Sequence, residues 1–310
     1  MSAPDLYAEL RPRAFAIAYR MLGSASEAED VVQEAFLRMH QTLQRDEPIA
    51  SPRAYIATLV TRLAIDQLRS ARARRERYVG EWLPEPLVTE PTPAEHAETA
   101  DSLSLAFLVL LESLSPQQRA AFLLREVFDY PYPEVAEIIG TDVDSTRHLV
   151  ARARTHIRER RPRYYASRRQ RQELAQRFFA AAEQGDLRAL EALLAQDVAL
   201  HADGGGKVPA PTRPVNGRER VARTLSAGMS VFARLGGRLQ VTEVNGQPGA
   251  MVYDSHDRLL GVVGLGIADD QIQTIHSIAN PDKLGHLGRV SVLGALLRAD
   301  RRSGDDGSRR

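Results

Sequence analysis

The sequence predicts a multidomain protein in which two all-α regions are followed by an α+β domain. Apolar residues recur at helical spacing over residues 5–77 and again over residues 102–161. From about residue 170 to residue 290 the density of arginine falls, glycine becomes more frequent, and short β-like runs alternate with helical segments. The length of 310 residues exceeds one average domain and is enough for two or three.

Composition narrows the class of protein. The apolar fraction of 43% is sufficient for a buried core, and no apolar run approaches the ~20 residues needed to cross a bilayer. The N-terminal stretch MSAPDLYAELRPR shows no apolar signal segment. The chain has no cysteine, which excludes disulfides, thiolate catalysis and cysteine-ligated zinc. We therefore expect a cytoplasmic protein with no membrane partner, no cofactor and no metal site.

Charge is segregated along the chain, although the net charge is only +1. Residues 62–77 hold six arginines against two acids, and residues 143–163 hold seven against two. Residues 78–101, between these two basic segments, hold six acids and neither lysine nor arginine. This pattern fits a polyanion bound at two places. It equally fits two solvated helix faces joined by a solubilising linker, and charge alone does not decide between them.

In the first region, a helix is expected to follow Ala25, with Ser26 as its N-cap and Glu29 completing a capping box. Its apolar stripe consists of Val31, Val32, Ala35, Phe36, Met39 and Leu43. The prolines of the segment DEPIASP (46–52) end this helix. A second helix is expected from Pro52 to Arg75, apolar in its first half and strongly basic in its second.

Residues 78–101 contain four prolines and the only tryptophan of the chain, and they predict an extended linker with neither helix nor strand. Helices resume at 102, and Ser115, Pro116 and Gln118 form a strong helix start. Two short helices then flank a turn at Gly140, the spacing of a helix-turn-helix, and the second of them is basic.

The last domain is expected to mix helices and strands. Helices are predicted at 171–184, 187–195 and 217–233, and strands at 197–202, 238–244, 249–254, 258–267 and 271–278. The tail after residue 298 has the composition of a disordered segment. The expected domains are residues 1–77, the linker 78–101, residues 102–163, residues 170–290 and the tail 291–310.

Several segments resemble a known family. The stretches AEDVVQEAFLR (28–38) and SPRAYIATLVTRLAIDQLRSARARR (51–75) resemble region 2 of the extracytoplasmic-function (ECF) sigma factors. The stretch LSPQQRAAFLLREVFDYPYPEVAEIIG (114–140), with the basic helix after it, resembles region 4. The motifs WLPEP (82–86), DGGGK (203–207) and NPDK (280–283) resemble those of the ECF subgroup with a C-terminal SnoaL-like domain.

This resemblance covers about residues 5–290 and implies a fold and a function. The implied fold is a region 2 helical bundle, a region 4 helix-turn-helix and an α+β SnoaL/NTF2-like cone. The implied function is to direct core RNA polymerase to specific promoters. Regulation by the fused C-terminal domain is a hypothesis that rests on its covalent attachment and on the lack of a catalytic constellation in the sequence. The implied partners are core RNA polymerase and promoter DNA. A small-molecule ligand of the C-terminal domain is left open.

The resemblance also implies site residues in the two helical regions. Contacts with core polymerase are expected at Asp30, Gln33, Glu34 and Arg38. Contacts with the −10 element are expected at Arg53, Tyr55, Arg62, Asp66, Arg69 and Arg72. Family members commonly carry Trp at the position of Tyr55 and Asn at that of Arg62. Asp66 either binds a base or pairs with Arg62 or Arg69, and we favour the ion pair. Contacts with the −35 element are expected at Thr146, Arg147, His148, Arg152, Arg154 and Arg158.

In the linker and the last domain we expect an interdomain regulatory surface. Its residues are Trp82, Leu83, Pro84, Glu85, Pro86, Asp203, Lys207, Asn280, Asp282 and Lys283. Gly204–Gly206 is expected to form a sharp turn with positive φ, because it lacks the sequence context of a phosphate loop. His201, Asp203, Lys207, Asp254 and His276 are the polar candidates for a pocket in the cone.

Two other functions fit parts of the sequence. The first is a stand-alone, ligand-responsive regulator that binds DNA through residues 115–160 alone. Region 2 argues against it, because such a protein has no use for a polymerase-binding helix. The second is an isomerase or cyclase tethered to DNA, which an Asp–His pair converging in a closed apolar pocket would favour. The spacing of His201, Asp203 and His276 does not decide whether they converge.

Overall fold

The computed structural model describes residues 3–45, 48–75, 77–89, 102–158, 167–234 and 236–291, with backbone only for 3–4 and 71–75. Its contacts divide the chain into two compact units. The first unit combines Met1–Arg77 with Phe107–Arg161, and the second combines Tyr78–Ala106 with Pro162–Arg310. The linker segment from Tyr78 onward therefore belongs with the last domain.

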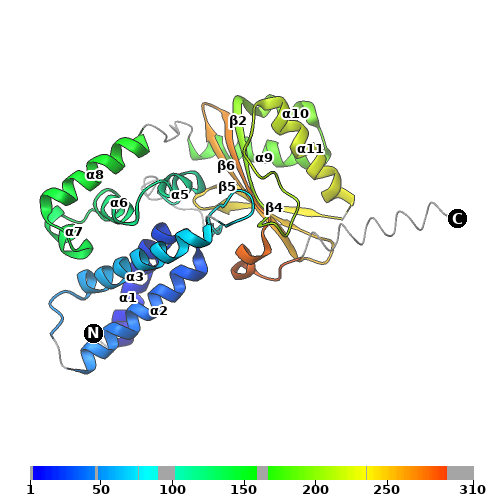
Figure 1. Ribbon diagram of the computed structural model, residues 1–310. Coiled ribbons are helices and arrows are strands. Elements are labelled where there is room, and N and C mark those ends of the chain that lie inside the picture. The colour runs from blue at the N-terminus through cyan, green and yellow to red at the C-terminus, as the bar shows by residue number, and fades with distance from the viewer. Residues whose placement is uncertain are drawn as a thin grey trace. The chain divides into compact units, whose positions relative to one another are not determined.

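The first half of the first unit consists of three helices, α1 (Ala3–Leu22), α2 (Ala25–Gln44) and α3 (Pro52–Arg75), which pack against one another (Figure 1). The buried face of α2 repeats at helical spacing through Ala28, Val32, Ala35 and Met39. This confirms most of the predicted apolar stripe. Leu43, at its end, is 37% exposed instead.

The predicted N-cap of α2 is wrong. The cap is Ser24, whose hydroxyl accepts a hydrogen bond from the backbone N–H of Glu27 at 3.1 Å. The helix starts earlier because Ala25 is buried in the core, and because Gly23, at φ 66°, turns the chain directly out of α1. The Glu29 carboxylate is not used for capping, and instead it pairs with Arg11 of α1 at 2.7 Å.

The second half of the first unit is also helical. It contains α5 (Leu105–Leu111), α6 (Pro116–Phe122), the π-helical turn η2 (Leu123–Val127), α7 (Tyr132–Ile139) and α8 (Val143–Arg158). The predicted start of α6 is confirmed, with Ser115 and Gln118 forming a complete capping box. Gly140 ends α7 in the left-handed conformation at φ 72°, which produces the turn between the two helices of the predicted helix-turn-helix.

The second unit is an α+β domain built on one seven-stranded sheet of order β1-β4-β5-β6-β7-β2-β3. Its long strands are β2 (Leu194–Asp203), β4 (Arg238–Val244), β5 (Gln247–Tyr253), β6 (Leu259–Ala268) and β7 (Gln271–Ile278). Only the β2–β7 pair is parallel among the strands described. Helices α9 (Arg168–Gln184), α10 (Leu187–Leu193) and α11 (Arg218–Arg234) cover one face of this sheet (Figure 1). The expected α+β cone is confirmed.

Two short strands were not predicted. β3 (Val215–Asn216) pairs with β2, and β1 (Val88–Thr89) pairs with Val244 and Glu243 of β4. The linker was expected to contain no strand, because two residues are too few to show an alternating pattern. Asn245 extends this pairing, since its side-chain oxygen accepts from the N–H of Leu87 at 2.8 Å and its own N–H donates to the Leu87 carbonyl at 2.8 Å.

After the β-sheet come two single turns, η3 (Pro281–Lys283) and η4 (Gly285–Leu287). Residues 90–101 of the linker and the predicted disordered tail lie outside the described residues. Among the helices that the structure describes, none combines the length and the apolar content required to cross a membrane.

The corrected cap of α2 leads to a matched test. Replacing an N-cap serine by alanine removes one hydrogen bond to the first turn, so Ser24→Ala is expected to lower the free energy of unfolding by ~1 kcal/mol. Ser26→Ala, at an exposed position inside the helix, is expected to change it by less than ~0.5 kcal/mol. Urea unfolding followed by circular dichroism measures both, and a larger loss for Ser26→Ala would restore the original prediction.

Candidate functional site

The predicted polymerase-binding residues lie together on the solvent side of α2. Asp30, Gln33 and Arg38 are exposed, and Glu34 pairs with Arg38 at 2.7 Å one helical turn away. Leu37 lies among them and is 52% exposed, a feature that the sequence analysis did not single out. A polar face around one exposed apolar side chain has the character of a protein-binding surface.

The predicted −10 residues of α3 are already engaged within the first unit. Arg53 pairs with Glu9, and the Tyr55 hydroxyl lies 2.9 Å from that of Thr42. Asp66 lies 3.4 Å from Arg69, which is the geometry of the favoured ion pair. Arg72 lies in the last turn of α3, where side chains are outside the described part of the structure.

Arg62 has the most informative contacts of this group. Its guanidinium donates to the backbone carbonyls of Glu137 and Ile138, each at 3.0 Å. These carbonyls belong to the last turn of α7, where a helix leaves carbonyls without intrahelical partners and where its dipole favours a cation. A residue expected to bind DNA in region 2 therefore caps a helix of the helix-turn-helix in this structure.

Two further arginines make the same kind of contact. Arg13 of α1 donates to the carbonyl of Phe128 at 2.9 Å and to the Tyr130 hydroxyl at 3.2 Å. Arg119 of α6 is buried and donates to the carbonyl of Met21 at 2.7 Å. Burial lowers the pKa of Arg119, and its ion pair with Glu112 at 2.8 Å offsets part of this cost. The two helical halves are thus tied by arginines that bind backbone carbonyls.

The predicted −35 residues of α8 divide into two sets. Arg147, His148, Arg152, Arg154 and Arg158 are exposed. Thr146 is fully buried, and its hydroxyl bonds to Thr141 at 2.8 Å and to the carbonyl of Asp142 at 2.9 Å. Thr146 shares the buried face of α8 with Val150 because four residues make one helical turn. In this structure it therefore holds the turn of the motif instead of facing solvent.

Two of the exposed arginines have acidic neighbours. Arg147 lies 3.0 Å from Asp144, with both side chains largely exposed, so that ion pair is weak and easily exchanged for a phosphate. Arg154 forms a two-pronged pair with Glu126 at 2.7 and 3.2 Å, which anchors α8 to η2. Arg152 and His148 are therefore better placed than Arg154 to bind an external ligand.

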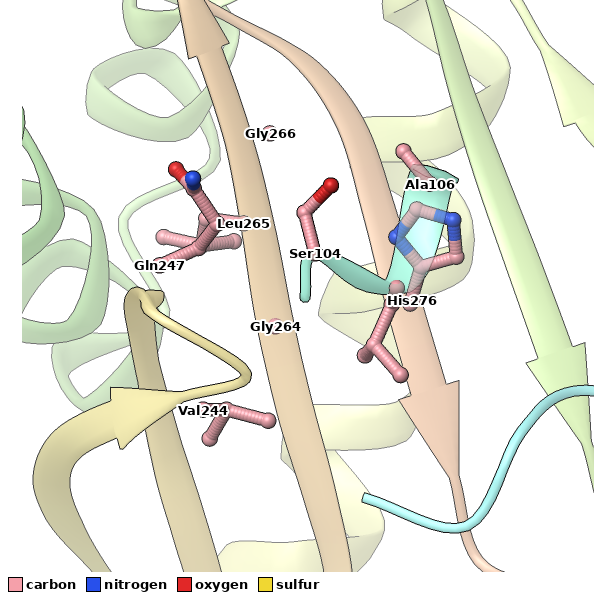
Figure 2. Close-up of a pocket in the computed structure, with 9 residues that line it drawn as sticks. Ser104, Ala106, Val244, Gln247, Gly264, Leu265, Gly266 and His276 are labelled. Carbon is pink, nitrogen blue, oxygen red and sulfur yellow. The ribbon is translucent and has the colours of Figure 1, made fainter. Parts of the chain in front are cut away.

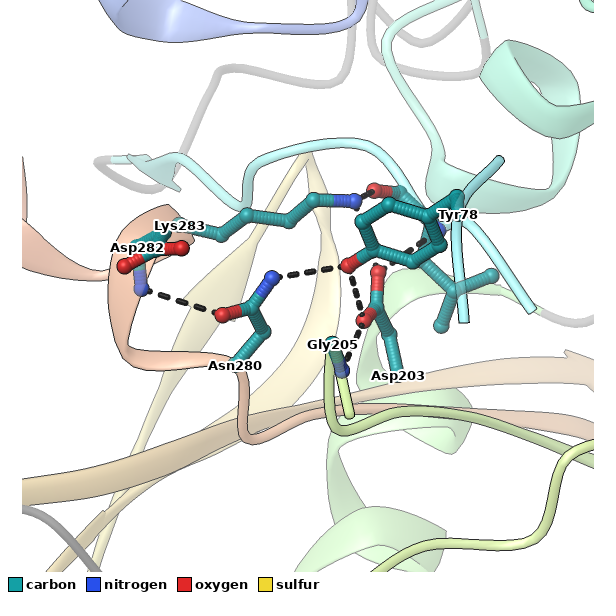
Figure 3. A network of polar contacts seen from close by, with 7 residues as sticks. Tyr78, Asp203, Gly205, Asn280, Asp282 and Lys283 are labelled. Carbon is teal, nitrogen blue, oxygen red and sulfur yellow. Dashed lines mark hydrogen bonds and ion pairs between the residues drawn. The ribbon is translucent and has the colours of Figure 1, made fainter. Parts of the chain in front are cut away.

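In the second unit, Leu83 and Lys283 of the predicted regulatory residues meet at the carboxylate of Asp203 (Figure 3). Asp203, at the end of β2, accepts four hydrogen bonds. These come from the Tyr78 hydroxyl at 2.6 Å, the N–H of Gly205 at 3.0 Å, the N–H of Leu83 at 2.9 Å and the Lys283 ammonium at 2.6 Å. We call Tyr78, Leu83, Asp203, Asn280 and Lys283 the linker clasp.

The other members of the clasp complete the network. Asn280 donates to the Tyr78 hydroxyl at 2.7 Å, and its side-chain oxygen accepts from the N–H of Asp282 at 3.1 Å (Figure 3). Lys283 is buried, donates to the carbonyl of Leu83, and lies 4.1 Å from the centre of the Trp82 ring. Burial, followed by the hydrogen bond to Asp203, raises the pKa of Tyr78, so its hydroxyl stays protonated and donates.

Glycine makes the turn of the clasp possible. Gly205 and Gly206 have φ of 59° and 71°, which confirms the predicted sharp turn. A Cβ on Gly205 would lie 2.4 Å from the side chain of Asn280. The rest of the WLPEP motif is also held against the domain: Leu83, Pro84, Glu85 and Pro86 are buried, and the Pro86 carbonyl lies 2.8 Å from a ring nitrogen of His286.

Lys207, the second lysine, behaves differently. Its ammonium pairs with Asp282 at 2.6 Å, but both side chains are more than half exposed. Asp254 accepts from the N–H groups of His256 and Arg258 at 2.8 and 3.0 Å, so it stabilises its own turn between β5 and β6. The polar residues predicted for a pocket therefore have separate structural roles: Lys207 forms an ion pair at the surface, and Asp254 stabilises a turn.

His201 and His276 form a stacked pair with ring centres 5.2 Å apart. His201 lies 2.7 Å from the carboxylate of the linker residue Glu81. His276 faces a small pocket with Ser104 and Gln247, whose volume of about 10 Å³ is that of a single water site (Figure 2). Burial, and next the charge of His201, lower the pKa of His276 to about 3. His276 is therefore neutral at physiological pH.

The comparisons with known proteins agree with this architecture. Residues 6–74 match the family Sigma-70 region 2, and residues 104–157 match Sigma-70, region 4. The ECF RNA polymerase sigma factor SigJ of Mycobacterium tuberculosis is 37% identical over 289 residues, which cover 88% of this chain and 90% of that protein. This chain belongs to the family of ECF RNA polymerase sigma factors.

Two further relatives support the assignment. The probable ECF RNA polymerase sigma factor SigI of M. tuberculosis is 33% identical over 87% of this chain and 91% of its own. The crystal structure of M. tuberculosis SigJ matches with a TM-score of 0.73 and 34% identity, and covers 92% of this chain and 98% of that one. The likeness to SigJ thus extends through the C-terminal domain of this sigma factor.

Some site residues of the sigma factor were missed from the sequence. Tyr78 and the Glu81–His201 pair join the linker to the sheet, but a single tyrosine and a single glutamate in an acidic linker carry no distinguishing pattern. The arginine contacts of Arg13 and Arg62 were missed because their acceptors are backbone carbonyls, which every residue has. The position of Tyr78 shortly before the WLPEP motif is the one sequence feature that could have indicated its role.

The two lysines allow a matched test of the clasp. Lys283→Met leaves the Asp203 carboxylate buried without its cation, and is expected to lower the free energy of unfolding by ~3 kcal/mol. Lys207→Met breaks an exposed pair and is expected to cost less than ~0.5 kcal/mol. Urea unfolding followed by Trp82 fluorescence measures both. Equal effects would show that the buried pair does not hold the linker.

The pKa of His276 predicts a pH dependence. The unfolded chain binds a proton near pH 6.5 and the folded chain only near pH 3, so stability falls as the pH drops below 6.5. Between pH 7 and pH 5 this group is expected to cost about 2 kcal/mol. The ionisable groups next to His276 are His201, whose ring stacks on it, and Glu81, which pairs with His201.

The measurement compares urea unfolding at pH 7 and pH 5 for the natural protein and for His276→Gln. The variant is expected to lose about 2 kcal/mol less than the natural protein between the two pH values. An identical pH dependence would mean that His276 keeps its ordinary pKa in the folded protein.

Proposed function

We propose that this sigma factor directs core RNA polymerase to promoters through region 2 at −10 and region 4 at −35, and that its C-terminal domain restrains it by holding the linker. The family assignment supports the first part of the proposal. The linker clasp, with four hydrogen bonds on one carboxylate, is the observation that carries the second part. Binding to core polymerase would place the protein in the cytoplasm.

The polymerase-binding surface is proposed to be the exposed face of α2, namely Asp30, Gln33, Glu34, Leu37 and Arg38. The polar residues suit an interface that must form and release in each cycle of initiation. Leu37 supplies an apolar contact at its centre. Exposed Glu34 and Arg38 pair with each other in the free protein, so both are available to exchange partners at little cost.

The first unit is proposed to be a closed, resting form. The −10 and −35 elements lie about 25 base pairs apart, which is roughly 85 Å of straight duplex at 3.4 Å per base pair. In this structure the Arg62 guanidinium of region 2 donates a hydrogen bond of 3.0 Å to the end of α7 in region 4, so the two regions are in direct contact. Region 2 and region 4 therefore cannot bind both elements until the arginine–carbonyl contacts break, after which Arg62 is free to bind DNA phosphate.

The restraint is proposed to act on the linker. In ECF sigma factors the segment between regions 2 and 4 runs through the cleft of the polymerase, and acidic residues there suit a basic channel. In this protein Leu83, Glu85 and the neighbouring prolines are buried against the C-terminal domain. A linker held in this way is not available to the polymerase, so release of the clasp is expected to favour initiation.

The rival functions receive less support. A stand-alone DNA-binding regulator would not need region 2, which matches its family over residues 6–74. An isomerase or cyclase would need a general base with a free lone pair, or a general acid with a proton to donate, in a pocket that admits a substrate, and the pocket beside His276 has room for one water only. The Asp203 carboxylate has all its hydrogen-bonding positions in use, and Asp254 is bound to its own turn. We propose no catalytic role for the C-terminal domain.

The test is in vitro transcription with bacterial core polymerase and a genomic promoter pool, using the full-length protein. Promoter-specific transcripts are expected with the natural protein. Lys283→Met is expected to raise transcript yield at least three-fold because it loosens the linker. Lys207→Met, the matched control on the surface, is expected to leave the yield unchanged.

Two outcomes would contradict the proposal at different points. No transcripts from any of the three proteins, with the same polymerase active alongside another sigma factor, would refute the promoter-directing function. Equal transcript yields from Lys283→Met and the natural protein, under conditions where both proteins are folded, would refute restraint by the clasp and leave the promoter-directing function intact.

A further inference from the structure

The C-terminal domain contains a pocket of about 320 Å³ between its helices and the covered face of the sheet. Its walls include Phe178 and Phe179 of α9, Met229 and Phe232 of α11, and Leu200 and Ile275 of the sheet. This is a different place from the small water-sized pocket beside His276. Protein interiors are close-packed and keep few voids larger than one water molecule, so an open space of this size needs an explanation.

A glycine leaves the open side of this pocket unobstructed, at the expense of helix stability. Gly228 lies within α11 and lines the pocket, and a Cβ built on it would meet no atom within 4 Å. Glycine in a helix interior is less stable than alanine. The backbone here needs no special conformation, since Gly228 is not among the residues with positive φ. Gly228 is itself exposed, so it lies on the open side of the pocket, where a larger side chain would narrow the entrance.

The chemistry of the wall defines what the pocket can hold. Among the described residues that line it, Asp203 is the only charged one, and its carboxylate is already fully bonded in the clasp. The remaining polar side chains are the hydroxyls of Thr224 and Ser277. An ion would lose its hydration here without a counter-charge, which is strongly unfavourable. The volume lies at the lower end of the range for small-molecule sites.

We infer that this pocket binds an uncharged, largely apolar small molecule of two or three rings or a medium-length acyl chain, and that its occupancy is coupled to the linker clasp. The coupling rests on the proposed restraint by the clasp. The proposed binding site does not depend on that restraint.

The coupling follows from the strands that the two sites share. Ala202 lines the pocket, and the next residue of β2 is Asp203. Ala279 lines it at the end of β7, and the next residue is Asn280. The N–H groups of Ala279 and Asn280 both donate to the Asp203 carbonyl, at 2.8 and 3.0 Å. A ligand that displaces either strand end would therefore move a member of the clasp.

The rim of the pocket provides a second connection. Val208, Pro209, Ala210 and Pro211 line it and directly follow the glycine turn of the clasp. The N–H of Val208 donates to the Gly204 carbonyl at 3.1 Å, and a Cβ on Gly204 would lie 2.2 Å from the Val208 carbonyl oxygen. The rim and the turn are thus packed too tightly to move independently.

The binding site is tested with N-phenyl-1-naphthylamine, an uncharged apolar fluorophore, and the full-length protein. The natural protein is expected to bind it with an increase in emission. Gly228→Leu narrows the entrance of the pocket and is expected to weaken binding at least ten-fold. Gly228→Ala, the matched control, stabilises the helix but leaves most of the volume, and is expected to bind within three-fold of the natural protein. Equal binding by Gly228→Leu, with folding verified by circular dichroism, would overturn the site.

The coupling is tested with 1-decanol and Trp82, the only tryptophan of the chain, which contacts Lys283. Decanol does not absorb where tryptophan is excited. It is expected to displace the fluorophore and to change the acrylamide quenching of Trp82 at least two-fold in the natural protein, but not in Gly228→Leu. Failure to displace the fluorophore would overturn the proposed ligand class. Displacement with unchanged quenching would overturn the coupling. Neither readout depends on transcription, so a failed transcription assay is distinguishable from a failed ligand site.

Discussion

The second unit depends on a buried ion pair between Asp203 and Lys283. Each charge would be strongly unfavourable in the interior without the other, so the pair fixes the end of β2 next to η3. The linker fills most of the other hydrogen-bonding positions of the pair that the structure describes, through the N–H and carbonyl of Leu83 and the hydroxyl of Tyr78, and the N–H of Gly205 fills one more on Asp203. The linker therefore makes hydrogen bonds to this pair that water would otherwise make. Removing it would leave a buried carboxylate partly unsatisfied, which explains how an extended segment stays bound to a folded domain.

The first unit uses a different kind of connection, in which arginine side chains bind backbone carbonyls. Arg62 binds the end of α7, and Arg13 binds the carbonyl of Phe128. Such bonds are modest in net free energy, because water offers the same groups comparable hydrogen bonds when they separate. They hold the closed form without making its opening prohibitive. The buried Arg119 is the exception, and it lies where α6 meets α1, away from the exposed arginines of α8.

The sequence predicted elements well where periodicity is long, and its motifs singled out Asp203 and Lys283, which the structure brings into contact. All five long strands and all three helices of the last domain fall close to their predicted bounds, because each repeats its apolar pattern several times. β1 and β3 are too short for any pattern. The cap of α2 is Ser24 and not the predicted Ser26, because Ala25 is buried and the sequence alone does not show that burial. The resemblance to region 4 implies that Thr146 contacts DNA, whereas the helical period places its side chain inward in this structure.

The choice of lysine at position 283 has a physical reason. This chain uses arginine for nearly every basic position, and its only lysines are Lys207 and Lys283. Inside the clasp the cation lies between the Asp203 carboxylate and the Leu83 carbonyl, with the Tyr78 and Trp82 rings 4.9 and 4.1 Å away. A compact ammonium can donate in several directions from one point. A planar guanidinium carries five N–H donors in a rigid fork and would leave some of them unsatisfied in so small a space. Lysine is thus the cation that can be enclosed completely, and complete enclosure is what lets a buried charge serve as the anchor of the linker.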